Sequence, residues 1–147
     1  MDSYKPVQIL LVDDNPDDVL ITQRGMERSH VANTMHVARD GQEAIDFLFR
    51  QGQYGPDTPR PDLILLDVNL PKANGLEVLE RIRDNRELAA IPVIMLTASD
   101  RDEDVLRSYQ LGSNTYIQKP VEFEKFLHAL EVFGQYWIVI AKLPNAA

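Results

Sequence analysis

Blocks of apolar residues alternate with mixed segments along the chain, and their spacing predicts strands and helices in turn. Residues 7–12 form a nearly continuous apolar run, which is typical of a strand buried on both faces of a parallel sheet. Residues 41–50 instead carry Ala44, Ile45, Leu48 and Phe49 at helical spacing. The expected strands are 7–12, 34–38, 63–67, 91–96 and 114–118, and the expected helices are 16–28, 41–50, 75–85, 101–111 and one beginning near 121.

Turn and cap residues support these boundaries. Asn15 followed by Pro16 is typical of a helix start, and Gly112 is a plausible residue just beyond a helix end. Pro92 is tolerated only near the start of its strand, because it has no N–H to donate to a neighbouring strand. Alternating strands and helices imply right-handed crossovers and a parallel sheet covered on both faces. We therefore expect a doubly wound α/β domain with a five-stranded parallel sheet and five helices.

We expect residues 1–147 to form one domain, with its core at about 7–130 and a C-terminal extension at about 131–147. The absence of cysteine excludes disulfides and thiolate metal ligands. A formal charge of -8 without a basic stripe argues against nucleic-acid binding. No apolar stretch approaches the roughly 18 residues of a membrane span, and the N-terminus is short and polar. We expect a cytoplasmic protein with no membrane contact.

The connection 51–61 is unusual, because helix-to-strand loops in such domains usually have roughly 2–6 residues. It contains three prolines and two glycines, which predict a stiff surface loop. Two interpretations stay open, a tolerated insertion or a site of contact with a partner.

Carboxylate, hydroxyl and ammonium side chains stand at the carboxyl ends of four of the five expected strands. Asp13 and Asp14 follow the first strand, Asp67 closes the third, and Thr97 and Lys119 end the fourth and fifth. Each has an ordinary alternative explanation, because acidic residues often begin turns and Thr or Lys commonly closes a strand. The carboxyl ends of parallel strands lie on one edge of a sheet, so all five side chains are able to converge.

Three carboxylates at one edge repel each other, and a hard cation with oxygen ligands relieves that repulsion. The lack of cysteine and of nearby histidine favours Mg²⁺ over zinc. Asp67 is then placed to attack phosphorus and form an aspartyl phosphate. The ammonium of Lys119 would offset charge on the phosphoryl oxygens, and the Thr97 hydroxyl would donate to one of them.

Four motifs in this order resemble the receiver domain of bacterial two-component response regulators over about residues 7–130. They are VDD at 12–14, LLDVNLP at 65–71, LTA at 96–98 and YIQKP at 116–120. The resemblance implies that Asp67 accepts the phosphoryl group of a phosphohistidine on a sensor histidine kinase. It also implies that Asp13, Asp14, Asp67 and the backbone carbonyl of Asn69 surround Mg²⁺. Such a phosphorelay protein is not an enzyme acting on an external substrate, since it catalyses only its own phosphorylation and dephosphorylation.

The same resemblance implies further roles. Thr97 and Tyr116 would form a switch that alters the face built by the fourth helix, fifth strand and fifth helix. A half-buried strand tyrosine with a solvated hydroxyl is the simpler interpretation of Tyr116. The peptide between Lys119 and Pro120 is expected to be cis, and Asn69 and Ser99 occupy positions that tune autodephosphorylation. We also expect the flavodoxin-like strand order 2-1-3-4-5.

Residues 120–147 provide room for a last helix and a short tail but not for an output domain, so we expect signalling by protein contact with an unknown downstream target. The aromatic tail either folds over the domain or mediates self-association. With the 51–61 loop, it makes the chain resemble the small stand-alone regulators paired with bacterial and cyanobacterial phytochrome kinases, and a homodimer is expected. The candidate dimer or partner surface comprises Phe133, Tyr136, Trp137, Ile138 and Ile140.

Two alternatives belong to other classes. A haloacid-dehalogenase-like phosphatase also uses a strand-end aspartate nucleophile, but Asn69 lacks the second carboxylate, and the motif lies on the third strand rather than the first. A phosphorylation-independent interaction module, or pseudo-receiver, typically loses one of the five active-site residues. None of the five is missing here.

Overall fold

The computed structural model describes residues 6–28, 33–68, 70, 72, 74–97 and 115–118. Within these residues it contains five strands and three helices. In chain order they are β1 (Val7–Val12), α1 (Pro16–Arg28), β2 (Asn33–Ala38), α2 (Gly41–Phe49), β3 (Leu63–Asp67), α3 (Gly75–Asp84), β4 (Val93–Thr97) and β5 (Thr115–Gln118).

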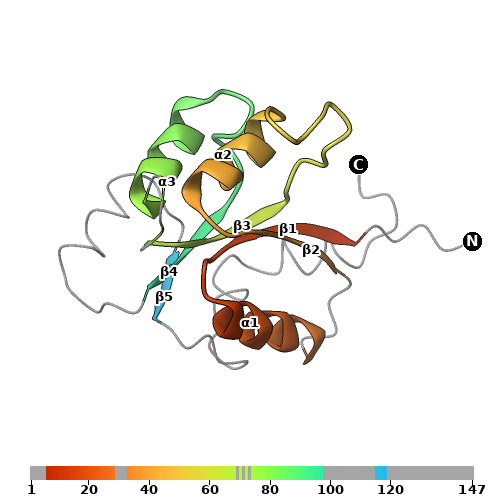
Figure 1. Ribbon diagram of the computed structural model, residues 1–147, viewed down its shortest axis with the longest axis vertical. Coiled ribbons are helices and arrows are strands. Elements are labelled where there is room, and N and C mark those ends of the chain that lie inside the picture. Colours follow the sequence, from red (N-terminus) through yellow and green to blue (C-terminus); the bar gives the residue numbers. More distant parts are fainter. Residues whose placement is uncertain are drawn as a thin grey trace, which may run out of the picture.

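All five strands form one parallel sheet in the order β2-β1-β3-β4-β5. Helices α2 and α3 cover one face of this sheet and α1 covers the other (Figure 1). The predicted doubly wound, flavodoxin-like fold is confirmed. The two helices expected after residue 100 lie outside the described residues. Among the described residues, none of the helices has the length and apolar character needed to cross a bilayer.

The predicted boundaries differ from the observed ones by two residues at most. Helices α2 and α3 each end one residue early, because Arg50 and Asn85 are C-cap residues. Strand β4 begins at Val93 rather than at residue 91. Pro92 has no N–H for the ladder, although its carbonyl accepts the amide of Ile64 at 3.0 Å. Strands β2 and β5 differ from the prediction by one residue at their starts.

Each face of the sheet carries its own apolar core. Leu10 and Val12 of β1 belong to the cluster that includes α2 and α3, while Ile9 and Leu11 belong to the cluster that includes α1. Since both faces are covered, all five residues of β3 are buried. This double covering is the reason why the inner strands β1, β3 and β4 read as nearly continuous apolar runs in the sequence.

One helix face was predicted incompletely. Phe49 belongs to the predicted apolar stripe of α2 but is only partly buried, with the Arg81 guanidinium 5.0 Å from the centroid of its ring. Phe47 is buried instead, and its ring centroid lies 5.3 Å from that of His36 and 5.1 Å from that of Tyr54. The sequence pattern did not show that Tyr54 of the long loop packs against Phe47 and adds to the core beside α2.

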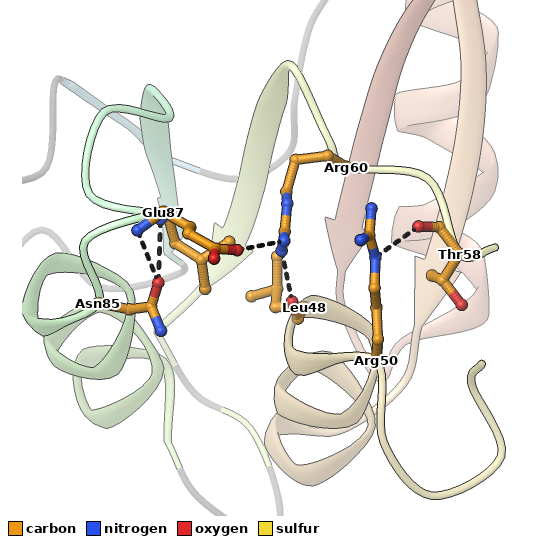
Figure 2. A network of polar contacts seen from close by, with 7 residues as sticks. Leu48, Arg50, Thr58, Arg60, Asn85 and Glu87 are labelled. Atoms are coloured by element: carbon orange, nitrogen blue, oxygen red, sulfur yellow. Dashed lines mark hydrogen bonds and ion pairs between the residues drawn. The ribbon is translucent and has the colours of Figure 1, made fainter. Parts of the chain in front are cut away.

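The 51–61 loop is hydrogen-bonded to the helices beside it (Figure 2). The Arg60 guanidinium donates to the Leu48 carbonyl at 2.8 Å and pairs with the Glu87 carboxylate at 2.9 Å. The side chain of Arg50 donates to the Thr58 carbonyl at 2.9 Å. These contacts give a structural basis for the expected stiffness of the loop, whereas its role in partner contact stays a prediction.

Candidate functional site

Three carboxylates lie together at the carboxyl edge of the sheet. One oxygen from each of Asp13, Asp14 and Asp67 lies within 4.8 Å of the other two. Asp13 is 0% exposed and Asp67 is 3% exposed, whereas Asp14 is open to solvent. The cluster therefore has a buried pair and one accessible member.

The strand register brings Asp13 and Asp67 to the same level. In the β1–β3 pair, Val12 lies opposite Leu66, so the residues that follow them, Asp13 and Asp67, lie at the same level. The amide of Asp13 donates to the Ala38 carbonyl at 3.0 Å and extends the ladder toward β2 by one residue. Sequence spacing cannot give this alignment, because it depends on how two strands 50 residues apart pair with each other.

The turn after Asp13 is organised by side-chain acceptors. One carboxylate oxygen of Asp13 accepts the amide of Asn15 at 3.0 Å. The Asn15 side chain in turn accepts the amides of Asp17 at 2.9 Å and Asp18 at 3.2 Å, so its predicted role as N-cap of α1 is confirmed. Asp13 and Asp14 thus immediately precede a helix N-terminus, where the helix dipole favours negative charge.

On the other side of the cluster, α3 begins directly against Asp67. The amide of Gly75 donates to the Val68 carbonyl at 2.9 Å. A Cβ at position 75 would collide with the backbone carbonyl oxygen of Asp67, so the close approach requires glycine. Sequence reasoning used Gly75 only as a helix boundary. The sequence did contain a signal for the close approach to Asp67, because glycine is a poor helix former and here occupies the first position of a helix.

The loop after Asp67 also contacts the start of α2. Lys72 has a φ of 51°, in the left-handed region, and its Nζ lies 4.0 Å from a carboxylate oxygen of Asp40. Asp40 is the N-cap of α2 and accepts the amide of Glu43 at 2.7 Å. Because the Lys72 side chain is 75% exposed, this ion pair adds little stability, but it links two loops.

The donor set fits a hard divalent cation. Each residue offers a carboxylate oxygen, the ligand type that Mg²⁺ and Mn²⁺ prefer. Two of the three carboxylates are buried, where mutual repulsion is poorly screened, so a cation would stabilise all of them. Asp13, Asp14 and Asp67 are therefore the residues that could hold it.

The backbone places one more predicted residue at this edge. Thr97 is the last residue of β4 and pairs with Gln118, the last residue of β5. Tyr116 pairs with Met95 inside the sheet. For Thr97 and Tyr116 the structure describes the backbone alone. The other predicted site residues lie outside the described residues: Asn69, Ser99, Lys119, Pro120, Phe133, Tyr136, Trp137, Ile138 and Ile140.

The fold and the cluster together define a doubly wound α/β protein with an acidic centre, suited to a divalent cation, at the carboxyl edge of its sheet. The family model of the response regulator receiver domain matches residues 9–131. The chain therefore belongs to the response regulator receiver family, whose members are generally signalling proteins.

Individual relatives agree with this assignment. The response regulator Rcp1 of Synechocystis sp. is 39% identical over 145 residues, covering 99% of this chain and 98% of the relative. The Mn²⁺-bound structure of Rcp1 has a TM-score of 0.78 and 38% identity, covering 95% of this chain and 100% of that one.

Two further solved structures are similar over most of their length. The bacteriophytochrome response regulator RtBRR has a TM-score of 0.83 and 43% identity, covering 97% of this chain and 86% of that one. The phosphorylated cyanobacterial phytochrome response regulator RcpA has a TM-score of 0.79 and 37% identity, covering 96% of this chain and 100% of that one.

Proposed function

We propose that this protein is a phosphoacceptor response regulator in which Asp67 receives a phosphoryl group from a sensor histidine kinase in a Mg²⁺-dependent reaction. The observation that carries the proposal is the convergence of Asp13, Asp14 and Asp67 within 4.8 Å at the edge where the sheet opens. Burial of Asp67 keeps its carboxylate poorly solvated and therefore more reactive as a nucleophile.

In the proposed reaction a carboxylate oxygen of Asp67 attacks the phosphorus of phosphohistidine. The new O–P bond forms as the P–N bond breaks, and the histidine nitrogen leaves with the bonding electron pair. Mg²⁺, when bound, offsets the negative charge of the carboxylates and of the phosphoryl oxygens. Asp13, Asp14 and Asp67 would hold it together with the carbonyl of Asn69. Lys119 would pair with a phosphoryl oxygen, and the hydroxyl of Thr97 would donate to another.

Downstream, the signal would pass by protein contact in the cytoplasm. Thr97 and Tyr116 would form the switch, while Asn69 and Ser99 would set the lifetime of the aspartyl phosphate. Support for a phytochrome as the kinase comes from the relatives, because RtBRR and RcpA are both named as phytochrome response regulators. A homodimer through the aromatic tail around Trp137 is part of the same proposal.

The test is phosphorylation by acetyl phosphate in the presence of Mg²⁺, followed by intact-protein and peptide mass spectrometry. We expect the gain of one phosphoryl group on Asp67, and no gain in Asp67→Asn. Asp57→Asn, which alters an exposed carboxylate in the long loop, is the matched control and should be labelled like the unmodified protein. Equal labelling of Asp67→Asn would reject the assignment.

Phosphotransfer from a panel of purified histidine kinases that includes phytochromes tests the partner. Rapid transfer from a phytochrome, with slow transfer from the other kinases, is the expected result. Preference for a kinase of another class would leave Asp67 as acceptor but remove the phytochrome from the proposal.

A further inference from the structure

Asn74 and Gly75 form an asparagine–glycine dipeptide, the sequence most prone to spontaneous deamidation because glycine has no side chain to shield its backbone nitrogen. In this reaction the deprotonated amide nitrogen of Gly75 attacks Cγ of Asn74. The side-chain nitrogen leaves as ammonia, and a five-membered succinimide forms. Water then opens the ring at one of its two carbonyls and gives either aspartate or isoaspartate.

The folded structure occupies both reacting groups. The Gly75 amide, which must lose its proton to become a nucleophile, donates that proton to the Val68 carbonyl at 2.9 Å. The side-chain oxygen of Asn74 accepts the amide of Glu77 at 3.0 Å as the N-cap of α3. Ring closure requires both hydrogen bonds to break, because the side chain has to turn from the helix toward the Gly75 nitrogen. Folding therefore suppresses the reaction, although Asn74 is exposed to solvent.

The two products have different consequences at this position. Aspartate at position 74 keeps an oxygen acceptor for the Glu77 amide, and aspartate caps helices as well as asparagine does. Isoaspartate instead routes the main chain through the former side chain and adds one carbon to the backbone just before Gly75. A Cβ on Gly75 already has no room beside the Asp67 carbonyl oxygen, so the start of α3 is unable to absorb a longer backbone without moving.

We propose that Asn74–Gly75 is a latent deamidation site, closed by the fold, whose conversion to isoaspartate disables the acidic centre. The reaction needs no partner other than water. It proceeds only while the first turn of α3 is locally open. The fraction of isoaspartate at position 74 therefore increases with the total time that this turn has spent open. The deamidation part of the proposal is independent of the proposed function, whereas the loss of the centre concerns the same Asp67.

The experiment compares the full chain in native buffer with the same chain unfolded in urea, both at mildly alkaline pH. Peptide mapping separates asparagine, aspartate and isoaspartate at position 74. We expect deamidation to be slower by about tenfold or more in the native chain, because local opening has to precede it. Asn85 is the internal reference. Like Asn74 it accepts backbone amides with its side-chain oxygen, in this case two, but arginine rather than glycine follows it. Equal rates at Asn74 in the native and unfolded chains would overturn the proposal.

Asn74→Ser is the matched variant, because serine keeps an oxygen that caps the helix but has no side-chain carbonyl from which the ring could form. It should fold normally, gain no isoaspartate during incubation and show the increase in melting temperature that we expect from Mg²⁺ binding at the acidic centre. The isoaspartate fraction, separated from aged protein, should lose that increase. An isoaspartate fraction with an unchanged response to Mg²⁺ would refute the loss of the centre. Loss of acetyl phosphate labelling in all fresh samples would instead count against the proposed function alone.

Discussion

Single residues determine how closely the elements approach the acidic centre, and Gly75 is the clearest case. Two effects of opposite sign meet at this position. Alanine is favoured over glycine in a helix by about 1 kcal/mol. Inserting a carbon into a packed contact costs about 1–3 kcal/mol, and here that contact is with the backbone of β3, which is unable to rotate away. The steric cost should therefore be the larger of the two.

Gly75→Ala should lower the free energy of unfolding by up to about 2 kcal/mol and weaken phosphorylation of Asp67. Urea unfolding and acetyl phosphate labelling are the measurements. Gly25→Ala is the matched control, because no described atom lies within 4 Å of a Cβ at this position in α1. Its expected effect has the opposite sign, a gain of about 0.5–1 kcal/mol. A stabilised Gly75→Ala variant would show that α3 adjusts more freely than we infer.

His36 should make the stability of the domain depend on pH. Burial disfavours the charged imidazole and lowers the pKa of His36 from its ordinary value of 6.5. Its Nε2 lies 2.8 Å from the Gln8 side-chain oxygen, and its ring lies beside Phe47. The unfolded state binds a proton more readily, so this contribution to stability is present above pH 6.5. It decreases as the pH falls from 6.5 toward the lower folded-state pKa.

An NMR titration should therefore give His36 a pKa below 6.5. In urea unfolding between about pH 7.5 and 5.5, the stability difference between the protein and His36→Phe should change in favour of the variant as the pH falls. A His36 pKa above 6.5 would reverse the sign and contradict the assignment of burial as the cause.

At the scale of elements, the side chain of Arg60 in the long loop contacts both the end of α2 and the segment that follows α3. Arg60 donates to the carbonyl of Leu48 in the last turn of α2, where a cation also interacts favourably with the helix dipole. It pairs with Glu87, whose side chain is 76% exposed, and that exposure limits the energy of the pair. The bond to Leu48 should therefore contribute more than the ion pair that Figure 2 draws beside it.

Arg60→Ala should lower the free energy of unfolding by about 1–2 kcal/mol, because a helix carbonyl loses its charged donor. Glu87→Gln should cost less than about 0.5 kcal/mol, since it weakens only the exposed pair. Urea unfolding of the two variants side by side is the measurement. If both changes cost the same, the ion pair rather than the bond to Leu48 would hold the loop.

At the scale of the whole molecule, cation binding should stabilise the fold. The three carboxylates converge only in the folded chain, so an ion that binds them shifts the folding equilibrium. Mg²⁺ at about ten times its dissociation constant should add about 1.4 kcal/mol to the free energy of unfolding. Thermal unfolding with and without Mg²⁺ measures the shift.

Asp14→Ala is the informative variant, because Asp14 is the exposed member of the cluster and its removal leaves the buried pair in place. It should fold and lose most of the increase in melting temperature, whereas Asp57→Ala should keep it. A full increase in Asp14→Ala, or no increase in the unmodified protein, would contradict the proposed metal site.

The sequence by itself determined the order of the described elements, most of their boundaries and the N-cap of α1. Apolar runs, helical spacing and the sequence Asn15-Pro16 are local properties, and local hydrogen bonds and solvent exposure enforce them. It also placed Asp13, Asp14 and Asp67 at strand ends. The burial of Phe47 could not be predicted in this way, because Tyr54, which packs against it, lies in a loop without a periodic pattern.

Only the tertiary structure decided how near the acidic side chains come to each other. The 4.8 Å cluster depends on the register of β1 against β3, and the need for glycine at position 75 depends on where α3 meets the end of β3. The first contact joins segments far apart in the chain, and the second joins two consecutive elements, but each depends on how two elements lie against each other. Pairing and packing fix such contacts, and no spacing within a single segment contains them.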